Sequence, residues 1–210
     1  MAFFTISRHS DDMSEIEQTM ADQGDTPVTY TLRKTVVMVG MMGAGKTAVG
    51  RALAHRLGVA FLDSDAEIEK AANRTVPEIF ARDGEPFFRA KETKVIKRLL
   101  DEKRCVLSTG GGAFLSEQNR DNISDKGVSI WLNADLELLW GRVRHKDTRP
   151  LLRTHDPKGT LRGIYEQRVP IYGLADIDVM SDSGCSIEGM VDRVLEALAA
   201  RPDVLEIHNA

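Results

Sequence analysis

The chain has 210 residues and a formal net charge of −4, and 42% of its residues are hydrophobic and 29% charged. This composition is typical of a globular protein with enough apolar residues for one core, so we expect a single domain. Residues 1–30 hold six acids and one base, a charge of −5, which leaves +1 for the rest. A nearly neutral body argues against a protein that binds nucleic acid through a basic surface.

Other classes are also disfavoured by the sequence. No apolar run approaches the roughly 18 residues of a membrane-spanning helix, and the first residues lack the pattern of a secretory signal. Two cysteines, Cys105 and Cys185, are too few for a disulfide scaffold. We therefore expect a cytoplasmic protein with unpaired thiols and no membrane partner.

Two regions differ in character along the chain. Residues 1–30 are polar and acidic without sustained periodicity, which predicts a disordered tail. Residues 31–210 alternate short apolar runs with helical patterns, which predicts one α/β domain: a three-layer sandwich around a five-stranded parallel sheet. The expected strands are 35–39, 61–63, 105–108, 128–132 and 177–180. The expected helices are 46–57, 66–72, 76–83, 85–102, 135–144, 160–172 (interrupted near Pro170) and 186–199, with a polar loop over 149–159.

A phosphate-binding loop follows the first of these strands. Residues 40–47 read Gly-Met-Met-Gly-Ala-Gly-Lys-Thr, which matches the P-loop pattern G-x-x-x-x-G-K-[ST]. The glycines let backbone N–H groups approach an anion, and the next helix adds its positive N-terminal end. Lys46 is placed to reach the β- and γ-phosphates of a nucleotide, and the Thr47 hydroxyl to ligate Mg²⁺.

Two acids follow the second strand. Asp63 and Asp65 come at the carboxyl end of 61–63, where side chains of a parallel sheet face the ligand crevice. If the strand stays extended, both point into that crevice. Asp63 is then a candidate for Mg²⁺ and Asp65 for a hydrogen bond or proton from a hydroxyl. The alternative is a pair that caps the following helix.

Taken together, several motifs resemble the shikimate kinase family. They are Gly-Met-Met-Gly-Ala-Gly-Lys-Thr, Phe-Leu-Asp-Ser-Asp-Ala-Glu-Ile-Glu, Glu-Pro-Phe-Phe-Arg-Ala-Lys-Glu, Ser-Thr-Gly-Gly-Gly-Ala, Thr-Arg-Pro-Leu-Leu and Gln-Arg-Val-Pro-Ile-Tyr, in family order between about Arg33 and Ala199. The resemblance implies a nucleoside-monophosphate-kinase-like fold with a substrate-binding region and a mobile lid over about 149–160. It also implies transfer of the ATP γ-phosphoryl group to the 3-hydroxyl of shikimate, a step of aromatic amino-acid biosynthesis.

The resemblance also implies a role for each matched residue. Lys46, Asp65 and Arg149 are the expected catalytic residues, with Arg149 in the lid. The expected ATP site is Gly43, Ala44, Gly45, Lys46, Thr47, Ala48, Arg142 and Arg149, with Arg144 as a competitor of Arg142 at the adenine. The expected substrate site is Asp65, Arg89, Gly110, Gly111, Gly112 and Arg168, with both arginines on the carboxylate. Thr47 and Asp63 are expected to hold Mg²⁺, and we expect a monomer.

Alternatives stay open for these residues. Arg89 and Glu92 are three positions apart on one predicted helix and fit an exposed ion pair. The three glycines fit a simple turn, and the +5 surplus of residues 142–168 fits a solvated face. At the level of function, the alternatives are another small-metabolite kinase, such as a gluconate kinase, and a nucleotide-binding module without turnover.

Overall fold

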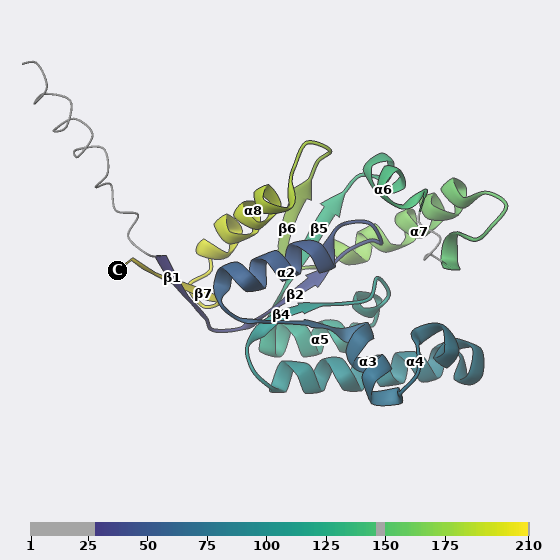
Figure 1. Cartoon of the computed structure of the whole chain (residues 1–210), viewed down its shortest axis with the longest axis horizontal. Coiled ribbons are helices and arrows are strands. Elements are labelled where there is room, and N and C mark those ends of the chain that lie inside the picture. The colour runs from purple at the N-terminus through teal and green to yellow at the C-terminus, as the bar shows by residue number, and fades with distance from the viewer. Residues whose placement is uncertain (1–27, 146–149, 210) are drawn as a thin grey trace, which may run out of the picture.

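The computed structural model describes residues 28–145 and 150–209. They form an α/β sandwich, with a small two-stranded sheet at one end (Figure 1). The strands are β1 (Val28–Leu32), β2 (Thr35–Val39), β3 (Ala60–Asp63), β4 (Cys105–Ser108), β5 (Gly127–Ala134), β6 (Ile177–Ser181) and β7 (Leu205–Asn209). The helices are α2 (Lys46–Leu57), α3 (Ser64–Ala72), α4 (Val76–Asp101), α5 (Glu117–Lys126), α6 (Leu136–Val143), α7 (Pro157–Tyr172) and α8 (Ile187–Ala199). Two 3₁₀ turns, η1 (Ala113–Leu115) and η2 (Pro150–Leu152), complete the described elements.

The main sheet has five parallel strands in the order β3-β4-β2-β5-β6, which confirms the predicted sheet. Its central strands β2 and β4 are buried along their whole length, because helices cover both faces. Helices α2 and α8 pack together on one face, and α4 and α5 lie on the other (Figure 1). The order puts β2 beside β4, so the loops after these two strands lie next to each other.

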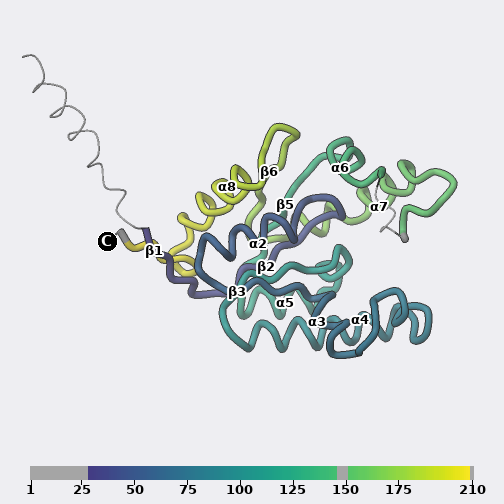
Figure 2. Tube along the Cα trace, in the orientation of Figure 1, coloured from purple at the N-terminus to yellow at the C-terminus, as the bar shows by residue number. Residues whose placement is uncertain are grey.

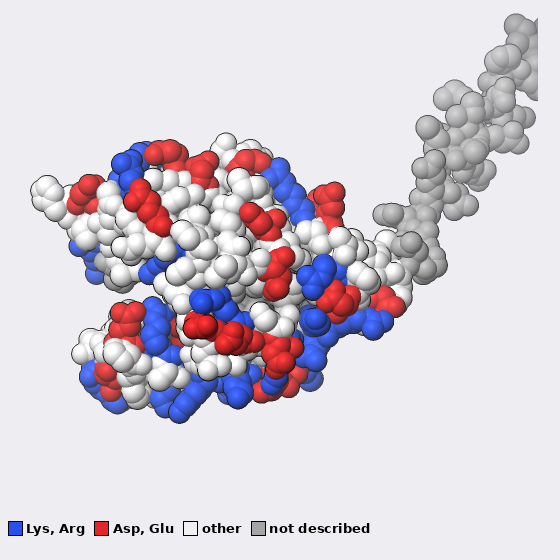
Figure 3. Space-filling view, turned by 180° about the vertical axis from the view of Figure 1, so that it is seen from behind, with Lys and Arg blue, Asp and Glu red and all other residues white. Residues whose placement is uncertain are grey.

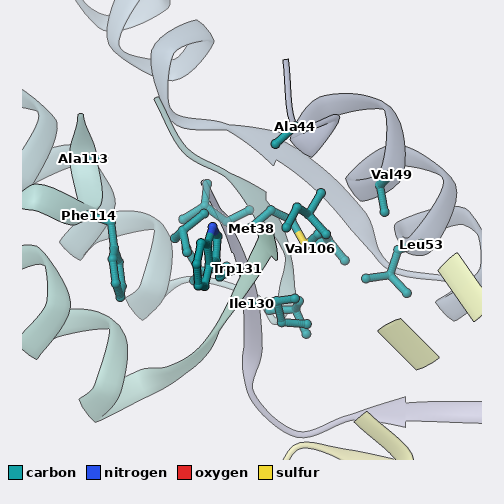
Figure 4. Close-up of a cluster of buried hydrophobic side chains, with 14 of the residues drawn as sticks. Met38, Ala44, Val49, Leu53, Val106, Ala113, Phe114, Ile130 and Trp131 are labelled. Atoms are coloured by element: carbon teal, nitrogen blue, oxygen red, sulfur yellow. The ribbon is translucent and has the colours of Figure 1, made fainter. Parts of the chain in front are cut away.

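The core lies between the sheet and its helices. Figure 4 shows part of it, where Met38 and Ile130 from the sheet meet Val49 and Leu53 from α2. Phe114 of η1 and Trp131 of β5 pack in the same cluster. This core holds the P-loop and the loop after β4 on rigid strands.

Helix α4 has a bend at Gly84, where φ is 80° and ψ is 170°. Only glycine adopts this combination without strain. The sequence predicts two helices that meet at this residue, and the bend confirms the break. A capping box begins the first half: the Glu78 backbone N–H donates to the Thr75 hydroxyl, and the Glu78 carboxylate accepts from the Thr75 backbone N–H.

Besides the two 3₁₀ turns, one helix and two strands were not predicted: α5 and the antiparallel pair of β1 and β7, in which Val28 lies opposite Asn209. Residues 28–30, which the sequence analysis placed at the end of the tail, are the first residues of β1, and residues 1–27 lie outside the described residues. The interruption expected near Pro170 does not occur, since α7 continues to Tyr172. Helix α7 also begins at Pro157, inside the segment predicted to be a loop.

Candidate active site

The P-loop joins β2 to α2 with three glycines at positive φ: Gly40 at 133°, Gly43 at 85° and Gly45 at 101°. A β-carbon on Gly43 would lie 2.7 Å from Cγ1 of Val143, so a side chain there would clash with α6 as well as strain the backbone. The Lys46 ammonium donates to the backbone oxygens of Gly40 at 2.9 Å and Met41 at 3.0 Å. The loop therefore surrounds the N-terminus of α2, and the Lys46 ammonium lies against the loop backbone. A helix N-terminus of this kind suits anion binding.

A cleft of about 490 Å³ opens over this loop. Its walls come from the P-loop, from β3 and α3, from the end of β4, and from the segment between β6 and α8. The lining residues are Met42, Gly43, Ala44, Gly45, Lys46, Thr47, Ala48, Val49, Asp63, Asp65, Ser108, Thr109, Gly110, Gly111, Arg142, Ser181, Cys185, Ser186, Ile187 and Met190. Most of the predicted ATP-binding residues thus share one cavity with Asp65 and two of the three glycines.

The two acids after β3 have different surroundings. Asp63 caps α3, since its Oδ1 accepts from the backbone N–H of Asp65 at 3.0 Å and of Ala66 at 3.3 Å. The capping alternative is therefore realised for Asp63, although the residue also lines the cleft. Strand β3 ends at Asp63, so Asp65 reaches the cleft from the first turn of α3 and not from an extended strand.

Asp65 is a half-buried carboxylate against the first glycine of the triplet. A β-carbon on Gly110 would lie 2.8 Å from Asp65 Oδ1. That oxygen is buried and has no hydrogen-bond partner among the described residues. Burial, and next the negative charge of Asp63, raise the pKa of Asp65 to about 6, although Lys46 and Arg89 act in the opposite direction. A carboxylate in this state is poised to accept a hydrogen bond or proton from a hydroxyl near neutral pH.

Arg89 lies against the third glycine. A β-carbon on Gly112 would come within 2.4 Å of Arg89 Nη2, so the absence of a side chain makes room for the guanidinium. Nη1 of Arg89 donates to Glu92 Oε2 at 2.9 Å, and Nη2 to Glu85 Oε1 at 3.1 Å. The ion pair that the sequence allowed therefore exists, but Glu92 is only 1% exposed, and the pair lies at the glycine triplet.

Arg168 lies against the middle glycine. Its Nη1 donates to the backbone oxygen of Gly111 at 3.1 Å, and the Tyr172 hydroxyl donates to the same oxygen. Arg89 and Arg168 are 79 positions apart in sequence, yet they flank consecutive glycines. The structure thus brings the six predicted substrate-binding residues together beside the P-loop.

Arg142 of α6 also lines the cleft. Its Nη1 donates to the backbone oxygen of Gly43 and its Nη2 to the Ser181 hydroxyl, both at 3.3 Å. Arg144 follows the end of α6, is exposed, and does not line the cleft. This geometry favours Arg142 over Arg144 at a nucleotide base.

Arg149, the predicted lid arginine, lies outside the described residues. The described elements before and after it in the chain are α6 and η2. Figures 1 and 2 show α6 and α7 at the upper right of the molecule and α3 and α4 at the lower right. Figure 3, the view from behind, shows a hollow in the molecular surface with acidic and basic side chains interspersed around it.

The donors in the cleft fit a magnesium ion. Thr47 offers a hydroxyl and Asp63 a carboxylate, and Mg²⁺ prefers such oxygen ligands. Within residues 28–145 and 150–209, no group of three or more histidine, cysteine or acidic side chains is placed to hold a metal. The cleft therefore suits an ion that arrives with nucleotide phosphates and binds one or two side chains, as Mg²⁺ usually does.

Sequence reasoning missed three features of the site. The sequence indicates Glu92 only as an exposed partner of Arg89, and it gives no role to Tyr172. It also gives no sign of the wall formed by Ser181, Cys185, Ser186, Ile187 and Met190. The hydroxyl of Tyr172 and the wall residues reach the site only through tertiary packing. The spacing of Arg168 and Tyr172, one helical turn apart, is the one signal that could have indicated a shared contact.

Comparison with known proteins gives a consistent result. The sequence model of the shikimate kinase family matches residues 42–199. The shikimate kinase of Ruegeria pomeroyi is 68% identical over 93% of this chain and all of its own length, and that of Cereibacter sphaeroides is 67% identical over 85% of this chain and 89% of its own.

Solved structures agree with the sequence relatives. The shikimate kinase of Acinetobacter baumannii in complex with shikimate is 38% identical, with a TM-score of 0.75 over 80% of this chain and 93% of its own. A gluconokinase from Sinorhizobium meliloti, 18% identical with a TM-score of 0.53, shares the fold alone. The chain belongs to the shikimate kinase family.

Proposed function

We propose that this protein transfers the γ-phosphoryl group of ATP to the 3-hydroxyl of shikimate, giving shikimate 3-phosphate and ADP, through the residues of the cleft. The observation that supports this reaction best is the arrangement around Gly110, Gly111 and Gly112. The half-buried carboxylate of Asp65 and the guanidinium groups of Arg89 and Arg168 surround the triplet, next to the P-loop. Two cations and one proton acceptor suit a ligand with one carboxylate and several hydroxyls.

In this proposal the nucleotide lies over the P-loop. The backbone N–H groups of residues 43–48 and the Lys46 ammonium bind its phosphates, and Arg142 lies at the adenine. Mg²⁺, held by Thr47 and Asp63, would neutralise charge on the phosphates and help to orient them. No step needs a protein nucleophile, so catalysis depends on positioning and charge stabilisation.

Shikimate occupies the adjoining pocket. Arg89 and Arg168 bind its carboxylate by charge-assisted hydrogen bonds, which sets the orientation of the ring. Asp65 accepts a hydrogen bond from the attacking hydroxyl and takes its proton as the phosphoryl group is transferred. Arg149 is proposed to reach the transferring group when the lid over about 149–160 closes and excludes water.

An assay with several acceptors tests the proposal. Release of ADP is measured with shikimate, with gluconate and without an acceptor, at equal ATP and Mg²⁺ concentrations. We expect turnover with shikimate that exceeds both other rates by at least tenfold. Faster turnover with gluconate would identify a different metabolite kinase, and absence of ADP release with every acceptor would identify a nucleotide-binding module without turnover.

Two further properties complete the proposal. We place the enzyme in the cytoplasm, where the thiols of Cys105 and Cys185, which form no disulfide, would stay reduced. We also propose that it acts as a monomer, because one chain supplies the whole described site. No helix in the described part of the chain is long and apolar enough to cross a membrane.

A further inference from the structure

Tyr172, the last residue of α7, is fully buried beside the substrate pocket. Its hydroxyl donates to the backbone oxygen of Gly111, the middle glycine of the triplet. Arg168, one turn earlier on α7, donates to the same oxygen at 3.1 Å. Two donors from one face of a helix therefore hold a single carbonyl group.

This carbonyl belongs to the central peptide of a turn, which the Ala113 N–H closes by donating to the Gly110 backbone oxygen at 3.1 Å. Type I and type II turns both keep such a hydrogen bond but differ in the orientation of the central peptide. Gly111 and Gly112 have no side chains, so their backbone dihedrals have wide freedom. In a planar trans peptide, the C=O of Gly111 and the N–H of Gly112 point in opposite directions. Holding the carbonyl oxygen toward α7 therefore directs the N–H of Gly112 away from α7 and sets the plane of the whole unit.

The tyrosine side chain is enclosed by its neighbours, since none of its surface is exposed. Its ring stacks on Trp131 of β5, with 6.3 Å between centroids and 30° between planes. Trp131 in turn borders the start of the P-loop, since a β-carbon on Gly40 would lie 3.2 Å from its Cδ1. Burial raises the pKa of the Tyr172 phenol, although the Arg168 guanidinium opposes the shift, so the hydroxyl keeps its proton at neutral pH and remains a donor.

We propose that Tyr172 is a positioning residue for the carboxylate substrate: through the Gly111 oxygen it fixes both the glycine peptide and the guanidinium of Arg168. It touches neither reactant in this scheme and acts through groups that do. The inference rests on the proposed function, because it assigns to Arg168 and the glycine triplet the binding of shikimate.

The test is Tyr172→Phe in the full chain, which removes one oxygen and leaves the ring packing in place. We expect the KM for shikimate to rise about two- to tenfold, the range for loss of one neutral hydrogen bond. The KM for ATP should stay unchanged, because the P-loop contacts are untouched. The matched control is Tyr165→Phe on the same helix, whose hydroxyl makes no described hydrogen bond and whose loss should alter neither KM.

A second variant tests whether Tyr172 affects substrate binding through Arg168. If Tyr172 acts through Arg168, the two are coupled, and Tyr172→Phe should raise the shikimate KM less in an Arg168→Ala background than in the wild type. Equal increases in both backgrounds would show that it does not act through Arg168.

The outcomes separate this inference from the function on which it rests. An active wild-type enzyme whose shikimate KM is unaffected by Tyr172→Phe would reject the inference alone. Parallel increases in the KM for shikimate and for ATP, with a lowered Tm, would show that the hydroxyl serves general packing. A wild-type protein that did not phosphorylate shikimate would reject the proposed function, and the inference with it.

Discussion

Asp65 combines burial with an unbonded oxygen, and this combination has a measurable pH dependence. Its pKa of about 6 in the folded protein lies well above the 3.8 of an ordinary aspartate. We expect kcat/KM for shikimate to fall tenfold per pH unit below about pH 6, because protonation removes the acceptor for the attacking hydroxyl. A pH–rate profile between pH 5 and 8 measures this limb; a flat profile down to pH 5 would remove Asp65 from the proton transfer.

The matched control is Asp65→Asn, a substitution that should raise the stability of the protein while it lowers the activity. A raised folded-state pKa favours folding when the group is protonated, and that stability is lost as pH rises from about 4 through about 6. The neutral amide should therefore unfold at a higher temperature than the wild type above pH 6, by an amount that corresponds to about 1–3 kcal/mol, while turnover is nearly abolished. Below pH 4 the difference in Tm should disappear.

If Arg89 and Arg168 bind the shikimate carboxylate, their positive charges and the negative charge of the ligand should be energetically coupled. Each set of charged hydrogen bonds to the shikimate carboxylate should contribute about 1.5–3 kcal/mol, so each alanine variant should bind shikimate roughly ten- to a hundredfold more weakly, with little change for ATP. Replacing the shikimate carboxylate by an amide should weaken binding to the wild type strongly. The same replacement should weaken binding to either variant much less, because one of the carboxylate's partners is already absent. Titration of shikimate and its amide into all three proteins gives the coupling energy between each arginine and the carboxylate. If the amide bound more weakly than shikimate by the same factor in all three proteins, these arginines would not bind the carboxylate.

At the scale of elements, the bend in α4 positions Arg89. Gly84 has a conformation that other residues reach only with strain, so Gly84→Ala should lower the free energy of unfolding by about 1–3 kcal/mol. Because Arg89 follows the bend by little more than one turn, the KM for shikimate should also rise. Denaturant unfolding and steady-state kinetics measure the two effects.

A glycine in regular helix serves as the control. Gly163 lies inside α7, and a β-carbon there would meet nothing within 4 Å. Gly163→Ala should therefore stabilise the protein by about 0.5–1 kcal/mol and leave both KM values unchanged. Similar losses in the two variants would mean that the bend has no special role.

The elements that the sequence predicts and those it misses differ in what stabilises them. Buried parallel strands such as β2 and β4 are uninterrupted apolar runs, so composition alone indicates them. Helix α5 has only Asn119 and Ile123 buried, and its polar sequence carries almost no helical periodicity. Strands β1 and β7 depend on each other across 177 positions, as the contact between Thr31 and His208 shows, and no local pattern encodes such a pair.

For the candidate site, the sequence indicates most of the residues but not the way in which they come together. The P-loop is a local motif, and Asp65, Arg89 and Arg168 follow from the family resemblance. Their convergence on consecutive glycines depends on the strand order, which sets β2 beside β4 and lets Thr109 bond the backbone oxygen of Met38. For Tyr172 the sequence offers only its spacing of one helical turn from Arg168, because its contact with Gly111 spans 61 positions and exists only in the packed fold.

For the whole molecule, the β1–β7 pair predicts how the chain tolerates truncation. Removing residues 1–27 should change kcat, KM and Tm little, whereas removing residues 1–32 deletes β1 and exposes Leu205, which is 2% exposed in the intact protein. The second deletion should lower Tm by several degrees. Thermal unfolding of the three proteins tests this, and a large loss from the first deletion would show that residues 1–27 pack on the body or reach the site.

The pairing of Val28 with Asn209 also has a topological consequence, since it brings the two ends of the described chain within one strand spacing of each other (Figure 1). A two-residue Asn-Gly linker could join them as an ordinary hairpin. New ends could then be made between Glu102 and Lys103, in an exposed bend before β4. This bend lies at the amino ends of the parallel strands, away from the cleft at their carboxyl ends. We expect such a circular permutant to fold and to keep the wild-type KM for both substrates, because the order in which the elements are synthesised would change while every contact of the site is retained.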